Sequence, residues 1–180
     1  MLTITVPASE YFDPETETFF STKEQKLVLE HSLISISKWE SKWGKSFLDK
    51  RTQKTRGESL DYIRCMTITQ NVDPLVYYAL TPKNLEEIVN YMEAPMTATW
   101  FSQDNGPPSR EILTAEVIYY YMVSFQIPFE CEKWHFNKLM TLIRVCSEKN
   151  KPPKKMSKRT IMSRNQALNA LRRQKTGNLG

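Results

Sequence analysis

The chain has 180 residues, of which 40% are hydrophobic and 25% are charged, so it can form one ordinary soluble domain with a short appendage. Only five glycines occur, which leaves little material for a glycine-rich phosphate loop, and no Walker or dinucleotide fingerprint is present. The net charge of +5 is very unevenly spread, because residues 149–180 hold 10 basic and no acidic residues and leave 15 basic and 20 acidic residues in 1–148.

The first 31 residues are predicted to form strands. LTITV (2–6) alternates apolar and polar residues and ends at Pro7, which is typical of a short strand. The acidic stretch 10–18 is predicted to be a loop. TFFS (18–21) and QKLVLEHS (25–32) are two further predicted strands, which we expect to pair with each other as a hairpin through TKEQ. The N-terminus lacks a basic n-region and a long apolar run, so no signal peptide is expected.

Helical patterns begin at Ser32, which can cap a helix that stops at Gly44 and carries Trp39 and Trp43 on one face. A polar, basic loop over 49–59 follows.

Two further segments come before residue 81. The segment 58–70 is predicted to be a helix, since Leu60, Ile63 and Ile68 recur at roughly helical spacing. Residues 73–80 form a predicted short helix or turn that begins with Asp73 and Pro74.

The segment TPKNLEEIVNYMEAP has the clearest local signals of a helix. Thr81 can cap it, Pro82 suits the first helical position, and Pro95 ends it. We expect its apolar residues to form one stripe: Leu85, Ile88, Val89 and Met92.

Two longer helices are predicted in the second half of the body, after a loop over 96–108. The first runs over 109–126 from a Ser109 cap, is apolar on most faces, and is therefore expected at the centre of the body. The second covers 128–150, with apolar residues at three- and four-residue spacings among Trp134, Leu139, Leu142, Ile143 and Cys146.

The pattern changes at the adjacent prolines Pro152 and Pro153, which lie among lysines and predict an extended linker. Residues 157–175 regain helical character, with Ser157 as a cap and a thin apolar stripe. The predicted fold class is mainly α: a helical domain of about five helices (1–149) with a small N-terminal β element (1–31), followed by a basic tail (150–180) that is mobile or helical on binding.

The sequence offers little for catalysis. Cys65, Cys131 and Cys146 are an odd set without a CxxC motif, which indicates reduced thiols in a packed interior. Cys131 and His135, four residues apart, make half of a metal site, but no second spaced pair accompanies them. The carboxylate pairs Glu86–Glu87 and Glu130–Glu132 are expected on solvated helix faces. We therefore expect no catalytic residue, metal or cofactor.

The basic tail allows three interpretations. Its cations could neutralise nucleic-acid phosphates, although it has no aromatic residue for stacking on bases, and the acidic body would repel a polyanion. It could be an interaction arm that orders against an acidic partner groove. It could also be a solvated tail that aids solubility. For the second interpretation, one candidate partner is the chain's own acidic stretch, within or between subunits: Glu10, Asp13, Glu15, Glu17 and Glu24.

Over roughly residues 32–175 the chain resembles the tail assembly chaperones of long-tailed bacteriophages. The resemblance lies in the residue pattern and the order of five segments: KWESKWGKSFLD, SLDYIRCMTITQNVDP, EAPMTATWFS, SREILTAEVIYYYMVSFQIPFECEKWHFNKLMTLIRVC and KKMSKRTIMSRNQALNALRRQK. It implies a non-enzymatic protein that binds the long helical tape measure protein and keeps it soluble while the tail tube assembles.

The resemblance also implies where the protein acts and which proteins it binds. Such proteins act in the bacterial host cytoplasm and are absent from the finished virion, and they often occur as a shorter and a longer product through translational frameshifting, of which this chain would be the shorter. Because many copies would be needed along one client, self-association is a further expectation. No membrane partner is expected.

Charge and periodicity in the tail identify the residues expected to bind a partner. They are Lys154, Lys155, Lys158, Arg159, Ile161, Arg164, Leu168, Leu171, Arg172 and Arg173. The alternative functions left open are a structural virion protein of the tail or connector, and a basic-tailed nucleic-acid-binding protein.

Overall fold

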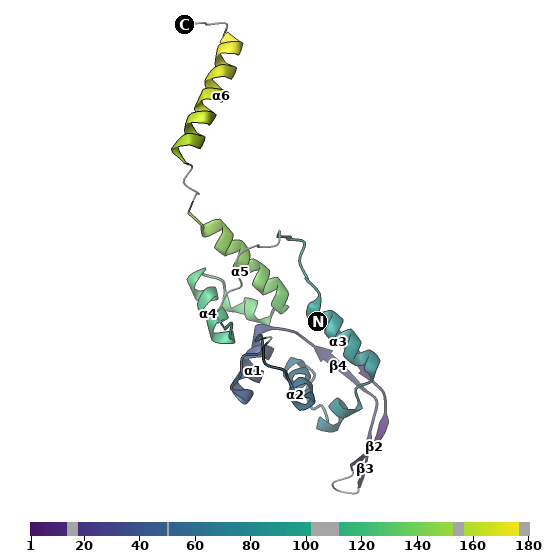
Figure 1. The fold of residues 1–180 in the computed structure, drawn as a ribbon. Helices are drawn as coiled ribbons and strands as arrows, with labels where there is room; N and C mark the ends of the chain where they lie inside the picture. The colour runs from purple at the N-terminus through teal and green to yellow at the C-terminus, as the bar shows by residue number, and fades with distance from the viewer. Residues whose placement is uncertain (14–17, 50, 102–111, 153–156, 177–180) are drawn as a thin grey trace. The chain divides into compact units, whose positions relative to one another are not determined.

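A computed structural model describes the chain apart from residues 14–17, 50, 102–111, 153–156 and 177–180 (Figure 1). The fold is mainly α, as predicted. The chain divides into two compact units, residues 1–147 and 148–180, and each is described by itself.

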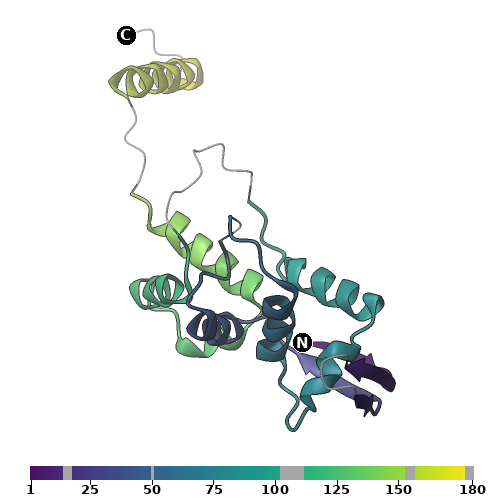
Figure 2. The ribbon, with the colours of Figure 1, turned by 60° about the horizontal axis from the view of Figure 1, so that its bottom comes forward.

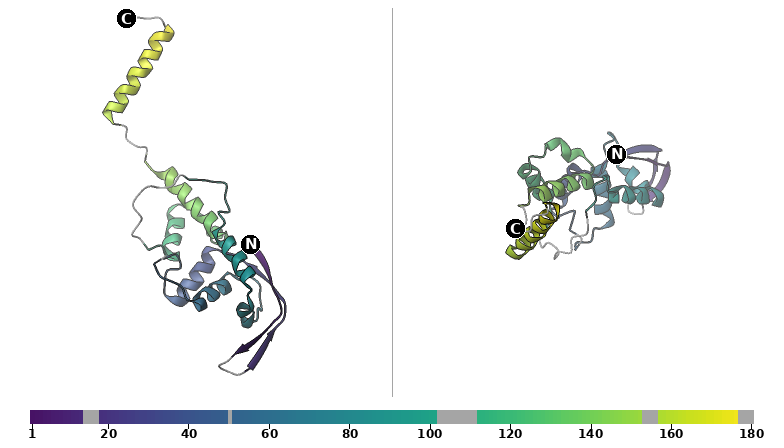
Figure 3. Two further views of the ribbon diagram at one scale, coloured as in Figure 1. Left: turned by 45° about the vertical axis from the view of Figure 1, so that its right-hand side comes forward. Right: turned by 90° about the horizontal axis from the view of Figure 1, so that it is seen from above.

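The N-terminal segment forms one long antiparallel hairpin in two parts. Strand β1 (Leu2–Val6) pairs with β4 (Gln25–Leu29), and β2 (Ser9–Asp13) pairs with β3 (Thr18–Thr22). The register is continuous across the break, because Val6 lies opposite Gln25 and Ser9 lies opposite Thr22. Figure 3 shows the two parts following one another along one curved ribbon.

This arrangement corrects two predictions. The expected hairpin of β3 with β4 is wrong, because these strands are successive parts of one arm and each pairs with the other arm. The loop predicted over 10–18 is also wrong at both ends, because residues 10–13 belong to β2 and Thr18 begins β3; residues 14–17 lie outside the described residues. Pro7 has no N–H to donate, and its position coincides with the interruption of the ladder.

Helix α1 (Leu33–Trp43) has the boundaries that its end residues predict. The Ser32 Oγ accepts a hydrogen bond from the Ser35 N–H at 3.3 Å. At the other end Gly44 has a φ of 62°, a left-handed conformation that glycine adopts without a Cβ penalty, and its N–H donates to the Glu40 carbonyl.

Helix α2 (Arg56–Met66) packs against α1 and begins with a capping box between Thr55 and Glu58. The Trp39 indole N–H donates to the Glu58 carbonyl at 2.8 Å, and the Trp43 indole N–H donates to the Asp61 carboxylate at 2.9 Å. The two tryptophans of α1 therefore fix α2 through hydrogen bonds as well as through apolar contact.

The prediction that α2 continues to residue 70 is wrong. The helix ends at Met66, and the chain then runs beside strand β4: the Ile68 N–H donates to the Val28 carbonyl, and the Glu30 N–H donates to the Met66 carbonyl. Thr67 and Ile68 are β-branched, which favours this extended path.

The next two elements confirm the predicted starts. The 3-10 helix η1 (Pro74–Ala79) begins after Asp73, and α3 (Pro82–Glu93) begins after Thr81 with a capping box to Asn84. Helix α3 lies beside β1, where the Asn84 side chain donates to the Thr5 carbonyl at 3.2 Å.

Helix α4 (Ala115–Ser124) is shorter than predicted and is not central. Residues 112–114 are not helical, so the continuous helix predicted over 109–126 is wrong; Ser109 itself lies outside the described residues. One face is buried through Ile118 and Met122, whereas Tyr120 and Val123 are exposed on the other.

The single helix predicted over 128–150 is broken in two. A 3-10 helix, η2 (Phe129–Lys133), comes first, and α5 (Phe136–Asn150) follows after the extended residue Trp134. The break is held by pairing to the residues before α1, because the Phe136 N–H donates to the His31 carbonyl at 2.7 Å. Trp134 does not join the core: it is 38% exposed, with the Lys138 ammonium 4.4 Å from its ring centre.

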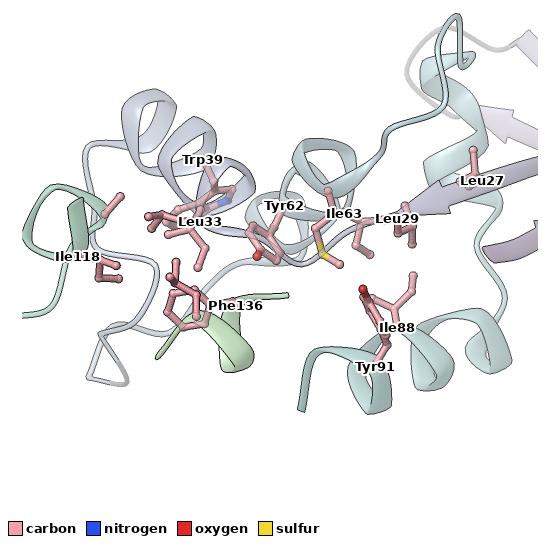
Figure 4. Close-up of a cluster of buried hydrophobic side chains, with 14 of the residues drawn as sticks. Leu27, Leu29, Leu33, Trp39, Tyr62, Ile63, Ile88, Tyr91, Ile118 and Phe136 are labelled. Atoms are coloured by element: carbon pink, nitrogen blue, oxygen red, sulfur yellow. The ribbon is translucent and has the colours of Figure 1, made fainter. Parts of the chain in front are cut away.

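The core of residues 1–147 lies where the hairpin meets the helices. Leu29 from β4, Leu33 and Trp39 from α1, and Tyr62 and Ile63 from α2 are buried together. Figure 4 shows Ile88 and Tyr91 of α3, Ile118 of α4 and Phe136 of α5 completing this cluster.

Candidate partner-binding helix

Helix α6 (Lys158–Thr176) is one uninterrupted helix within residues 148–180 (Figures 1 and 2). The Ser157 Oγ accepts from the Thr160 N–H at 3.2 Å, which is the predicted cap. Ala167, Ala170 and several Arg, Gln and Leu residues favour the helical state because they lose little side-chain entropy in it.

The side chains of α6 are exposed throughout Lys158–Lys175. Ile161 is 43%, Leu168 42% and Leu171 58% exposed, so the predicted stripe lies on the surface. A surface helix of a globular domain normally buries such a stripe against its own core, so this stripe is available to another molecule.

The charge of α6 is uniformly positive. It carries six basic and no acidic residues. Arg173 and Lys175 in the last turn oppose the partial negative charge of the helix end, whereas Lys158 and Arg159 in the first turn add to the partial positive charge there. An acidic partner would therefore relieve repulsion along the whole helix.

The structure thus gathers eight of the ten predicted partner-binding residues on one exposed helix. They are Lys158, Arg159, Ile161, Arg164, Leu168, Leu171, Arg172 and Arg173. Lys154 and Lys155 lie outside the described residues.

The two histidines lie together in the body instead of forming a metal site. Their ring centres are 5.3 Å apart, and both side chains are buried. The His135 Nε2–H donates to the Tyr91 carbonyl at 3.0 Å, and its Nδ1 accepts from the Asn137 N–H, so neither nitrogen is left to bind a metal. The His31 Nδ1 lies 2.5 Å from the Tyr62 hydroxyl.

Cys131 and His135 do not share an α-helix, because Cys131 lies in η2 and His135 precedes α5. Over the described part of the chain, no group of three or more His, Cys, Asp or Glu side chains could hold a metal ion. The three cysteines are free; Cys131 is buried, and Cys65 and Cys146 are half-buried. Burial raises the pKa of the Cys65 and Cys131 thiols, which disfavours the nucleophilic thiolate.

The members of the two carboxylate pairs lie at exposed or half-buried positions. Glu86 and Glu130 are exposed. Glu132 accepts from the Tyr119 hydroxyl at 2.8 Å, and the burial of Tyr119 together with this bond raises its phenol pKa. The bond between Tyr119 and Glu132 thus joins α4 to η2 at the surface of the body.

One exposed surface was missed by the sequence analysis. Leu85 and Val89 were expected to share one stripe with Ile88 and Met92, yet they are 39% and 50% exposed, whereas Ile88 is buried together with Asn84 and Tyr91. The signal was present in the sequence, because Asn84, Ile88 and Tyr91 also follow helical spacing and Tyr91 can bury a larger ring.

Comparison of the chain with protein-family models, with curated proteins and with solved structures finds no match, and within the described residues no helix is long and apolar enough to cross a membrane.

Proposed function

We propose that this protein is a non-enzymatic assembly chaperone that holds a long helical client, the tape measure protein of a long-tailed bacteriophage, in soluble form. The observation that carries the proposal is α6: an exposed helix with Ile161, Leu168 and Leu171 on its surface and no acidic residue. The identity of the client comes from the resemblance of residues 32–175.

The mechanism proposed is reversible covering of apolar helix faces. Isoleucine and leucine side chains of α6 would bury against the apolar stripe of a client helix, at about 25 cal/mol per Å² of apolar surface removed from water. The cations would select client segments that carry Asp or Glu beside that stripe, and would speed the encounter. Because no covalent step is involved, the client is released once the tube subunits compete for the same apolar faces.

The test is co-expression with the proposed client, the tape measure protein, followed by pull-down and measurement of the soluble client. We expect the full chain to hold the client in solution, and both the truncation 1–149 and the triple variant Ile161→Asp, Leu168→Asp, Leu171→Asp to lose this effect.

A matched control separates loss of the stripe from loss of charge. The variant Ser163→Asp, Gln166→Asp, Asn169→Asp adds the same three negative charges to exposed positions on the opposite side of α6, and should keep the client soluble. If the client is equally soluble without any form of this protein, or if the control fails as fully as the stripe variant, the proposal is wrong.

The charge of α6 favours one second candidate, binding to nucleic acid. Six cations on a helix could release counterions from phosphates, so retention on a DNA column would fall steeply as salt rises. A neutral stripe variant, Ile161→Ser, Leu168→Ser, Leu171→Ser, distinguishes the two functions because it keeps all six cations: a phosphate-binding helix should tolerate it, and a client-binding helix should not.

A further inference from the structure

Helix α3 carries an exposed apolar surface that its own domain does not use. Leu85 and Val89 lie one helical turn apart beside the face of α3 that buries Ile88 and Tyr91, and both are exposed. Met92 packs partly against the core, and Met96 is 42% exposed just beyond the helix end. The apolar face of α3 is therefore wider than the part that the core covers, and Leu85 and Val89 are open to a partner.

Two exposed carboxylates flank Val89 along the helix. Glu86, Val89 and Glu93 are spaced three and four residues apart, so they share one face of α3, with the apolar residue in the middle. At 1.5 Å of rise per residue, the two glutamates are about 10 Å apart along the helix axis.

Helix α6 carries the opposite pattern at nearly the same spacing. Arg164, Leu168 and Arg172 follow one another at four-residue intervals, so an exposed leucine lies between two arginines that are about 12 Å apart along the axis. Ile161 and Leu171 widen the apolar part of this face.

We propose that α3 is the docking site for helix α6 of a second copy of this chain. Leu85 and Val89 of one copy would pack against Leu168 of the other, and Glu86 and Glu93 would pair with its two arginines. The two triplets have opposite charges and similar lengths, so the two helices can lie side by side with every charge paired. An unrelated partner would have to match both the apolar residues and the spacing of the charges on α3.

The charge of the two units supports this occupant. Residues 1–147 hold 15 basic and 19 acidic residues, and residues 148–180 hold 10 basic and one acidic residue, so the units carry −4 and +9. Opposite fields of this size steer the unit 148–180 of one molecule towards the body of another. Because each copy carries both surfaces, the contact is heterologous and can add further copies.

A client and a second copy of this chain would compete for α6. The same face of α6 cannot bind α3 of a second copy and a client helix at once, so the client should dissociate the self-associated form. This competition rests on the proposed function, whereas self-association through α3 and α6 does not.

The experiment is sedimentation velocity on the full chain alone, over a wide concentration range. We expect reversible association that weakens at least about tenfold in Glu86→Lys, Glu93→Lys and in Arg164→Glu, Arg172→Glu, because each variant turns two attractive pairs into repulsive ones. The matched variant Glu10→Lys, Glu24→Lys makes the same charge change in the acidic stretch that is the other candidate partner of the tail, and should associate like the unmodified chain because the docking site is α3.

Mixing the two α3 and α6 variants gives the decisive measurement. In the mixture the lysines on α3 of one variant face the glutamates on α6 of the other, and the unchanged arginines on α6 of the first face the unchanged glutamates on α3 of the second. The mixture should therefore associate more strongly than either variant alone. A chain that is monomeric at every concentration, a matched variant as impaired as the α3 variant, or a mixture that stays monomeric would each overturn the proposal. Pull-down of the client with the same proteins tests the proposed function separately. Thermal melting of each variant shows whether it is folded.

Discussion

Glu40 shows how one buried residue joins distant parts of the chain. It lies in α1, yet its carboxylate accepts the Phe47 N–H and the Ala115 N–H, each at 2.7 Å. Thr114 precedes α4 but makes no capping bond with its side chain, so Glu40 supplies the acceptor and a negative charge at the start of that helix. Burial raises the pKa of Glu40, while the two hydrogen bonds act in the opposite direction.

We predict that Glu40→Ala lowers the free energy of unfolding by about 3 kcal/mol, since it leaves two backbone N–H groups in the interior without an acceptor. Glu40→Gln keeps one acceptor oxygen and should lower the free energy of unfolding by less. Urea unfolding at neutral pH measures both.

The control for this prediction is Glu24→Ala, at an exposed position of the hairpin, which should change stability by less than about 0.5 kcal/mol. A Glu40→Ala protein that unfolds at the same urea concentration as the control would show that water can replace the carboxylate.

The sequence predicted well those helices whose caps and stop residues lie within a few residues of their ends. Helix α1 starts at Ser32 and stops at Gly44, and α3 starts at Thr81 and Pro82, because a cap and a stop act on the adjacent backbone. The candidate helix α6 belongs to the same group, since its cap, composition and charge are all local.

Elements defined by distant partners were predicted poorly. The hairpin register depends on pairing across the whole of 2–29, so the short connection at Lys23 and Glu24 was mistaken for its turn. Helix α4 is capped from Glu40, which no local pattern reveals. The exposed stripe on α3 was missed because periodicity identifies an apolar face without saying which of two faces meets the core.

The helix α6 itself should be only marginally stable in isolation. Cations at Lys158 and Arg159 oppose the helix dipole, and like charges along the helix repel one another. We therefore expect a peptide of residues 157–176 to be weakly helical in water and to gain helicity as salt screens the repulsion, measured by far-ultraviolet circular dichroism.

Two substitutions with the same charge change test whether the helix dipole or the net charge limits the helicity of the peptide. Arg159→Glu in the first turn should raise the helicity of the peptide, whereas Arg173→Glu in the last turn should raise it much less or lower it. Equal gains from both would mean that net charge, and not the dipole, governs the helix.

At the scale of the whole body, the buried histidines join the elements of residues 1–147. His31 follows β4 and precedes α1, its Nδ1 meets Tyr62 of α2, and its carbonyl accepts the Phe136 N–H of α5. His135 adds a bond to α3 through the Tyr91 carbonyl. Placing a positive charge on either ring therefore disturbs the packing of several elements at once.

We predict that acid weakens the whole body through this pair. Burial, with the neighbouring His135 ring as a second cause, lowers the pKa of His31 from 6.5 to about 4, and burial also lowers the pKa of His135. Because the unfolded chain then binds protons more readily than the folded one, stability falls as the pH drops below 6.5, and the loss from His31 continues until about pH 4. At 1.36 kcal/mol per pH unit, His31 alone should remove about 2 kcal/mol between pH 6.5 and pH 5.

Urea unfolding at pH 7 and pH 5 measures this loss, and His31→Gln provides the comparison, because glutamine does not titrate in that range. The substitution can lower stability at both pH values through the bond to Tyr62, so the relevant quantity is the difference between them, which should shrink by about 2 kcal/mol. Carboxylates with lowered pKa values, such as Asp61, titrate below pH 5 and contribute equally to both proteins. If His31→Gln loses as much stability between pH 7 and pH 5 as the unmodified chain, protonation of the buried ring is not what destabilises the body.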